Sequence, residues 1–262
     1  KIFFYRMKKL INQLKNLKKL GIVAIKQSLE DEGASFEEIS LMIKITKKLG
    51  LKLNVKIGGC EAKNDVFFCD SIVSNGIVAP MVESEYALKK FIQTVPSTFK
   101  GDLYINLESK NAFKNLDKII TSKEFNLLKG VVIGRSDLAG SLNLTKSKVD
   151  SDKIFNLLKS NLKKIKNKRK LIKMGGSITL SSKKFILELF NKGLIDRVET
   201  RNIELKLSKR SLNKFDTIIP LIFNFEKEWL EYKNKNFKLN DSSRKSILNR
   251  IVEISKRENL FI

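Results

Sequence analysis

The fold class is decided by a nine-residue stretch in the middle of the chain, where an apolar run bounded by glycines leads into a polar turn. It reads Gly130-Val131-Val132-Ile133-Gly134-Arg135-Ser136-Asp137-Leu138. A short apolar run of this kind predicts a buried β-strand. A helical pattern follows near residues 150–167, and a strand followed by a helix is the repeating unit of an α/β fold. We therefore expect this stretch to form one unit of a parallel sheet.

The same unit recurs on both sides of this stretch, almost from one end of the chain to the other. Seven such units with no domain-sized linker favour a closed (β/α)8 TIM barrel over a doubly wound sheet. Strands are predicted at residues 21–25, 51–57, 76–82, 102–107, 130–134, 170–174 and 196–200. Helices are predicted at residues 5–20, 35–50, 62–73, 83–95, 109–120, 150–167 and 182–192.

One of the eight strands is missing from this pattern. We expect either that residues 1–5 supply it or that it lies before the first residue of the chain. The barrel domain is predicted to span residues 1–224, and residues 225–262 are predicted to form a C-terminal extension of two charged helices. Such an extension commonly covers a barrel or makes a subunit contact, so we expect a homo-oligomer.

The chain of 262 residues is strongly basic, with 52 Lys and Arg against 28 Asp and Glu and a formal net charge of +24. Most of the basic residues are lysines, whereas proteins that grip phosphates bidentately tend to need arginine. The densest basic run, residues 163–170, ends a predicted helix, where cations interact favourably with the helix dipole. We therefore expect no nucleic-acid partner.

Other function classes are excluded by what the sequence lacks. No apolar run approaches the roughly 20 residues that span a bilayer, so we expect no membrane partner. The two cysteines, Cys60 and Cys69, cannot form a disulfide framework in a chain of this size, which predicts a cytoplasmic location. The chain has no histidine, and this excludes Ser-His-Asp triads, histidine bases and histidine metal ligands.

Polar residues gather at the predicted strand ends, which is where TIM-barrel enzymes carry their chemistry. We expect these side chains to meet in one barrel mouth. The candidates are Lys26, Glu32, Lys56, Glu61, Glu108, Arg135, Ser136, Asp137, Gly175, Gly176 and Arg201.

Four of these candidates, Lys26, Lys56, Glu32 and Glu61, are predicted to move protons. A lysine among other cations can have a depressed pKa and serve as a base or a Schiff-base former. The alternative is a lysine–glutamate ion-pair network with no catalytic role. Backbone N–H groups of Gly175 and Gly176 can cradle an anion beside Arg201, although a Gly-Gly pair after a strand is also a common turn.

Three segments resemble the HpcH/HpaI aldolase and citrate lyase β-subunit family. They are residues 76–84, residues 104–112, which begin Tyr104-Ile105-Asn106-Leu107-Glu108-Ser109, and residues 131–142. The resemblance covers roughly residues 20–205, with the segments in the family's order on the predicted strand ends. It implies a TIM barrel of the pyruvate- or phosphoenolpyruvate-binding type. It also implies a carbon–carbon lyase or aldolase that acts on a 2-oxo acid through a metal-stabilised enolate.

The resemblance also assigns roles to individual residues. Glu108 and Asp137 match the family's metal ligands, and two carboxylates completed by water and substrate oxygens suit Mg²⁺ or Mn²⁺. Lys56 takes the place of the family's substrate-binding arginine. From their position at a strand end, we expect Arg135 and Ser136 to bind the substrate as well. Without a metal, Glu108 is a helix N-terminal acid and Asp137 a helix cap.

Two positions depart from the family pattern. Gly33 stands where the family's aldolases often carry a histidine, and Lys56 stands where they usually carry an arginine. Lysine supplies the charge of arginine but not its bidentate fork. Two alternatives to a 2-oxo-acid aldolase therefore remain. One is an acyl-thioester lyase of the malyl- or citramalyl-CoA type, and the other is a barrel that has lost catalysis and binds a ligand or partner.

Overall fold

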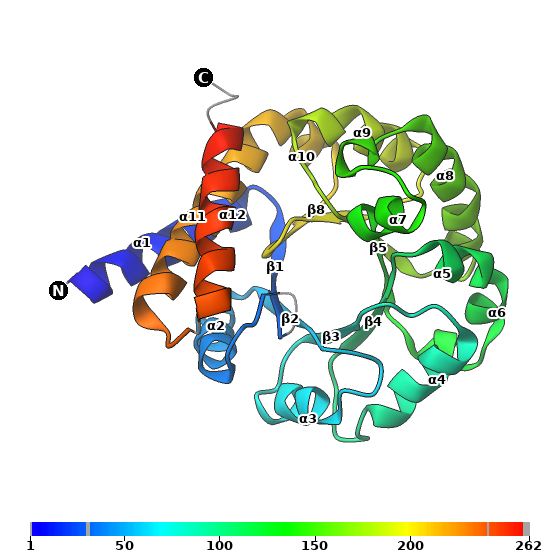
Figure 1. Ribbon diagram of the computed structural model, residues 1–262, viewed down its shortest axis with the longest axis horizontal. Helices are drawn as coiled ribbons and strands as arrows, with labels where there is room; N and C mark the ends of the chain where they lie inside the picture. Colours follow the sequence, from blue (N-terminus) through cyan, green and yellow to red (C-terminus); the bar gives the residue numbers. More distant parts are fainter. Residues whose placement is uncertain (1, 30–31, 240, 259–262) are drawn as a thin grey trace.

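The computed structural model describes residues 2–29, 32–239 and 241–258. Eight strands close into a barrel in sequence order, with helices around the outside (Figure 1). The predicted TIM barrel with a C-terminal helical extension is thereby confirmed. The strands are β1 (Ile22–Ser28), β2 (Lys52–Lys56), β3 (Gly76–Ala79), β4 (Asp102–Leu107), β5 (Gly130–Gly134), β6 (Leu171–Gly175), β7 (Arg197–Glu199) and β8 (Ile203–Lys206).

The helices form the outer layer, and α1, α11 and α12 gather on one side of the barrel next to β1 (Figure 1). The α-helices are α1 (Ile2–Lys19), α2 (Phe36–Leu49), α3 (Lys63–Ser71), α4 (Glu85–Thr94), α5 (Lys110–Lys114), α6 (Leu116–Thr121), α7 (Arg135–Ser141), α8 (Asp152–Asn167), α9 (Lys183–Asn191), α10 (Lys209–Asn213), α11 (Phe215–Asn236) and α12 (Asp241–Glu258). Three 3-10 turns are η1 (Glu124–Leu127), η2 (Lys146–Lys148) and η3 (Leu180–Ser182).

The eighth strand is not where the sequence pattern placed it. Residues 2–5 belong to α1, and β8 follows β7 after only three residues. A parallel neighbour needs a crossover of a dozen or more residues, so this short turn forces β7 and β8 into an antiparallel hairpin. β8 then pairs antiparallel with β1 as well and closes the barrel, while the other neighbouring strands are parallel. The tip of this hairpin, Thr200–Asn202, lies at the mouth of the barrel.

Side chains alternate between the two faces of each strand, and this alternation separates the apolar core from the polar interior. On β2, Leu53 and Val55 are fully buried in the main apolar core, which lies between the strands and the helices. Asn54 and Lys56, on the other face, point into the barrel. The same alternation on β4 directs Asn106 to the interior, and Glu108 follows directly after this strand, whereas β5 directs Val132 and Gly134 there.

A buried ionic network fills the barrel interior below the mouth. Lys173 on β6 and Glu204 on β8 are almost completely buried, and their Nζ and Oε2 atoms are 2.7 Å apart. Arg197 pairs with the other Glu204 oxygen, and Asn54 donates a hydrogen bond of 3.0 Å to Oε2. Although burial raises the pKa of Glu204, Lys173 and Arg197 hold it below its usual value. The Lys173 ammonium also lies 3.6 Å from the centre of the Tyr104 ring.

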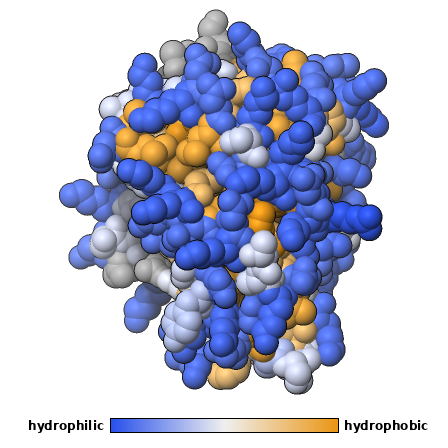
Figure 2. Space-filling view, turned by 90° about the vertical axis from the view of Figure 1, so that its right-hand side faces the viewer, coloured by the Kyte–Doolittle hydropathy of each residue, from blue (hydrophilic) through white to orange (hydrophobic). Residues whose placement is uncertain are grey.

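The C-terminal extension begins within a long helix. α11 starts ten residues before the predicted helix at 225, contains Pro220, and runs through the expected domain boundary at residue 224. Proline favours a break in a helix, but Ile219, Ile222 and Phe223 are buried on this helix, and their packing stabilises it. None of the described helices is long and apolar enough to span a membrane. On the side of α6 and α8, the surface is mostly hydrophilic with a few apolar patches (Figure 2).

Candidate active site

The barrel mouth holds a pocket of about 350 Å³, formed by strand ends together with residues of α11 and α12. Every predicted site residue except Glu61 and Arg135 lines it. The polar side chains around the pocket are Lys26, Ser28, Glu32, Lys56, Asn106, Glu108, Ser136, Asp137, Lys146, Ser177, Glu199, Thr200, Arg201, Glu226, Arg250 and Glu253.

Glu108 is a buried carboxylate at the end of β4. It lies directly before Ser109, whose side chain caps α5, so the strand end and the cap fix its position. Its Oε1 atom accepts a hydrogen bond of 3.0 Å from the Met81 backbone N–H, and Oε2 accepts one of 2.8 Å from Asn106 Nδ2. Burial raises the pKa of Glu108, and the charge of Asp137 raises it further, whereas Lys56 acts in the opposite direction.

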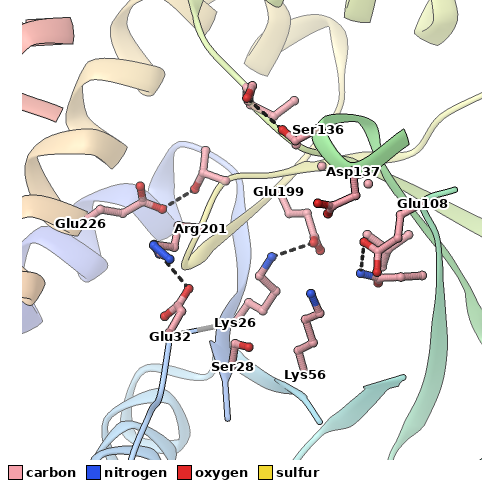
Figure 3. Close-up of a pocket in the computed structure, with 18 of the residues that line it drawn as sticks. Lys26, Ser28, Glu32, Lys56, Glu108, Ser136, Asp137, Glu199, Arg201 and Glu226 are labelled. Carbon is pink, nitrogen blue, oxygen red and sulfur yellow. Dashed lines mark hydrogen bonds and ion pairs between the residues drawn. The ribbon is translucent and has the colours of Figure 1, made fainter. Parts of the chain in front are cut away.

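Asp137 lies in the first turn of α7, directly after β5, and its side chain is exposed. The two carboxylates lie side by side on one wall of the pocket (Figure 3). Gly134, the last residue of β5, leaves room for this arrangement. A Cβ atom there would collide with the Glu108 carboxylate.

The Glu108–Asp137 pair fits a hard divalent cation. Carboxylate oxygens are the ligands that Mg²⁺ and Mn²⁺ prefer, and a metal ion would offset the cost of keeping Glu108 ionised in its buried position. The described residues contain no group of three or more acidic, cysteine or histidine side chains arranged to hold a metal. Glu108 and Asp137 would therefore supply two ligands and leave the remaining positions to water and substrate oxygens.

Lys26 and Lys56 occupy the middle of the pocket (Figure 3). Lys26 Nζ is 2.9 Å from Oε1 of Glu199, a buried carboxylate at the end of β7. Lys56 lies close enough to Glu108 to lower the pKa of that carboxyl. The two ammonium groups thus lie beside carboxylates at the ends of two different strands, Glu199 of β7 and Glu108 directly after β4.

Arg201 lies on the opposite side of the pocket from Glu108 and Asp137, at the tip of the β7–β8 hairpin (Figure 3). Its Nε atom donates a hydrogen bond of 3.1 Å to Glu32 Oε1, and Asn202 Nδ2 donates one of 2.9 Å to Glu32 Oε2. Glu32 is therefore held in place by two donors from this hairpin. That leaves it less suited to moving protons than the sequence predicted.

α11 contributes a further carboxylate, Glu226, to the pocket. Its Oε1 atom accepts hydrogen bonds of 2.6 Å from Thr200 Oγ1 and 2.8 Å from the Asn202 backbone N–H. Burial raises its pKa. By these contacts Glu226 fixes the β7–β8 hairpin against the extension.

The prediction that Arg135 binds the substrate is wrong, because its side chain does not face the pocket. Its side chain is completely buried, and its guanidinium pairs with Asp150 and stacks 5.1 Å from the centre of the Phe185 ring. Nε and Nη2 donate hydrogen bonds to the backbone carbonyls of Gly175 and Gly176 at 3.1 and 2.8 Å. Arg135 therefore positions the loop after β6 and is not available to bind a substrate anion.

The prediction that Glu61 moves protons in the barrel mouth is also wrong. This residue lies outside the pocket, 58% exposed, and its Oε1 atom is 2.8 Å from Lys90 Nζ on α4. Residues 58–61 continue past the strand end before α3 begins, and this carries Glu61 away from the barrel axis. Lys56, on the strand itself, keeps its predicted place. Ser136 also lies at the pocket and is 2.9 Å from the Ser177 hydroxyl, Oγ to Oγ.

The pocket residues of the extension, Glu226, Arg250, Glu253 and Ile254, were not found from the sequence. Glu226 had a recognisable signal, because it interrupts the apolar stripe of α11 between Phe223 and Leu230, and charged residues in such stripes are rarely there without a partner. Arg250 had none, because the face that α12 turns to the barrel depends on tertiary packing.

Comparisons with known proteins give the class of fold. No protein-family model and no curated protein sequence matches the chain. The HpcH/HpaI aldolase from Desulfitobacterium hafniense DCB-2 superimposes with a TM-score of 0.54 at 14% identity, over 62% of this chain and 72% of that one. An HpcH/HpaI aldolase/citrate lyase family protein from Burkholderia cenocepacia J2315 gives 0.56 at 10% identity, over 67% and 77%.

A third solved structure, the citrate synthase SbnG, gives a TM-score of 0.57 at 12% identity, over 67% of this chain and 75% of that one. At these identities the likeness is one of fold. Several of the structural neighbours are HpcH/HpaI aldolase/citrate lyase family proteins. This is the same family that the three sequence segments resemble. The chain thus has the barrel fold of these aldolase- and citrate-lyase-type enzymes.

Proposed function

We propose that this chain is a divalent-metal-dependent carbon–carbon lyase or aldolase that acts on a 2-oxo acid. The observation that carries the proposal is the pair of neighbouring carboxylates, Glu108 and Asp137, at the ends of two successive strands in the barrel mouth. The barrel fold supports it, because its structural neighbours include HpcH/HpaI aldolases. The lysines beside the pair supply the positive charge that an anionic substrate needs.

Each group in the pocket has a role in this proposal. A bound Mg²⁺ or Mn²⁺ ion, held by Glu108 and Asp137, would supply a Lewis acid for the 2-oxo-carboxylate end of the substrate. Lys56 takes the place of the family's arginine and binds the oxygen on which negative charge develops. Lys26 is the candidate for moving a proton, because its ammonium faces the pocket and Glu199 holds it in position. Glu61 has no role here.

Turnover measured with a panel of 2-oxo acids and aldehydes, with and without Mg²⁺ or Mn²⁺, tests the proposal. We expect bond formation or cleavage with at least one pair, and loss of this activity on chelation. Activity that persists after chelation would contradict metal dependence, and turnover of acyl-thioesters alone would contradict the 2-oxo-acid substrate.

Replacing Lys56 by Met is expected to lower kcat/KM by about 10²–10³-fold, the loss typical of removing a preorganised donor to developing negative charge. Lys56→Arg keeps the charge and is expected to retain partial activity. The kinetics of both variants with the panel substrate check this. Full activity of Lys56→Met would contradict the role, and a covalent adduct trapped by borohydride would replace it with Schiff-base chemistry.

Metal affinity is expected to fall as the pH falls, beginning at a higher pH than an ordinary glutamate would give. The raised pKa of Glu108 means that this carboxyl takes up a proton above its usual value of 4.5, and the protonated form is a poor metal ligand. Calorimetric Mn²⁺ titrations at a series of pH values measure the effect. An affinity that stays constant until the pH reaches 4.5 would contradict it.

A further inference from the structure

The C-terminal extension brings a second arginine to the pocket. Arg250 of α12 lines the wall near Arg201, and Glu253 and Ile254 from the same helix line it as well. Glu253 forms a 3.5 Å ion pair with Lys146 of η2, which ties α12 to a loop of the barrel. Residues outside the region of family resemblance thus form part of the site.

Arg250 is half-buried, and among the described residues its guanidinium has no hydrogen-bond or ion-pair partner. Three carboxylates lie in its surroundings, namely Glu32, Glu226 and Glu253. Each of these carboxylates already has another side-chain partner. Arg201 pairs with Glu32, Thr200 donates a hydrogen bond to Glu226, and Lys146 pairs with Glu253. Burial and the nearby charge of Arg201 lower the pKa of Arg250, although an arginine remains charged at neutral pH.

Arg201 and Arg250 repel each other across a partly buried wall, and the carboxylates around them already have other partners. A further anion bound by the two guanidinium groups would therefore be favourable. Guanidinium groups are also suited to carboxylate and phosphate oxygens, which they bind bidentately. Arg201 and Arg250 also line a second cavity of about 190 Å³. Because both residues line the main pocket as well, they lie where the two cavities adjoin.

The pocket therefore has two chemically distinct ends. Glu108 and Asp137 form the metal-binding end, and Arg201 lies on the opposite side, with Lys26 and Lys56 between them (Figure 3). A small 2-oxo acid bound through its 2-oxo-carboxylate group at the metal-binding end would leave the arginine end unfilled.

We propose that Arg250, together with Arg201, binds a second anionic group of the substrate, a carboxylate or a phosphate remote from the reacting carbon atoms. This inference rests on the proposed function and narrows its substrate class to 2-oxo acids with a distal anionic group. Arg250 is then a specificity-determining residue that the C-terminal extension supplies.

Calorimetric binding in the presence of Mg²⁺ tests the inference with three kinds of ligand. These are pyruvate, dicarboxylic 2-oxo acids of four to six carbons, and a 2-oxo acid with a terminal phosphate. The native chain should bind at least one of the doubly anionic ligands about tenfold more tightly than pyruvate. Replacing Arg250 by Met should lower the affinity for that ligand by about tenfold, the value of one charge-assisted hydrogen-bonded contact, and leave the affinity for pyruvate unchanged, so that the preference is lost. Arg250→Lys should restore part of it.

Arg244→Met is the matched control, because Arg244 is an exposed arginine on the same helix and its replacement removes the same charge. It should leave the preference unchanged. A preference for the dicarboxylate alone assigns a carboxylate to the arginine end, and one for the phosphate alone assigns a phosphate.

Three results would overturn the inference. An unchanged preference in Arg250→Met would show that Arg250 does not touch the ligand, and an equal loss in Arg244→Met would reduce the effect to net charge. Binding of pyruvate with no preference for a second anionic group would overturn the inference and leave the proposed function standing. Binding of no 2-oxo acid at all would overturn both.

Discussion

Replacing Asp137 by Asn should lower kcat/KM for the 2-oxo-acid reaction by about 10³-fold and abolish calorimetric binding of Mg²⁺ or Mn²⁺. The neutral amide is a weaker ligand, and the Lewis-acid contribution of a bound metal amounts to several kcal/mol of transition-state stabilisation, with about 1.4 kcal/mol for each factor of ten in rate. Because Asp137 is exposed, the substitution should leave the unfolding free energy within about 0.5 kcal/mol of the native value.

Glu61→Gln is the matched control for this substitution. Glu61 is an acidic residue that the sequence also placed in the site, but in the structure it pairs with Lys90 outside the pocket. Its replacement should leave kcat/KM within about twofold, since an exposed ion pair contributes little. Equal losses in the two variants would contradict the position of the metal site.

Replacing Lys173 by Met should lower the unfolding free energy by about 3–5 kcal/mol, which makes it the largest stability effect that we expect. Lys173 and Glu204 are both almost completely buried, and removal of the lysine leaves a buried carboxylate with less compensation. Urea unfolding measures the change.

Lys164→Met removes the same charge from an exposed ion pair with Asp117 and should cost less than about 1 kcal/mol. A loss below about 1 kcal/mol for Lys173→Met as well would show that the interior network does not stabilise the barrel.

The sequence predicted the barrel because its parallel units repeat a local pattern, and local patterns are what periodicity detects. It failed at β8, where Ile203-Glu204-Leu205-Lys206 alternates apolar and charged residues after a turn too short for a crossover. Alternation of this kind is typical of a strand, but an antiparallel hairpin does not repeat the strand–helix unit by which the other strands are recognised.

Within the site, residues on strands and directly after them were placed well, as Lys56, Glu108 and Asp137 illustrate. Arg135 was not, because proximity to a strand end does not fix the direction of a long side chain, and its hydrogen bonds to the loop after β6 turn it away from the pocket. Arg250 required tertiary information, since it reaches the mouth from a helix more than 100 residues after β5.

The most direct test of the central claim is exchange of the methyl protons of pyruvate with solvent D₂O, followed by proton NMR. Removal of a methyl proton gives the enolate that a 2-oxo-acid lyase stabilises, and the measurement needs no knowledge of the second substrate. We expect the methyl signal to disappear with the native chain and Mg²⁺ or Mn²⁺, and to persist after chelation or in Asp137→Asn. Exchange no faster than in buffer, with metal bound, would contradict the claim.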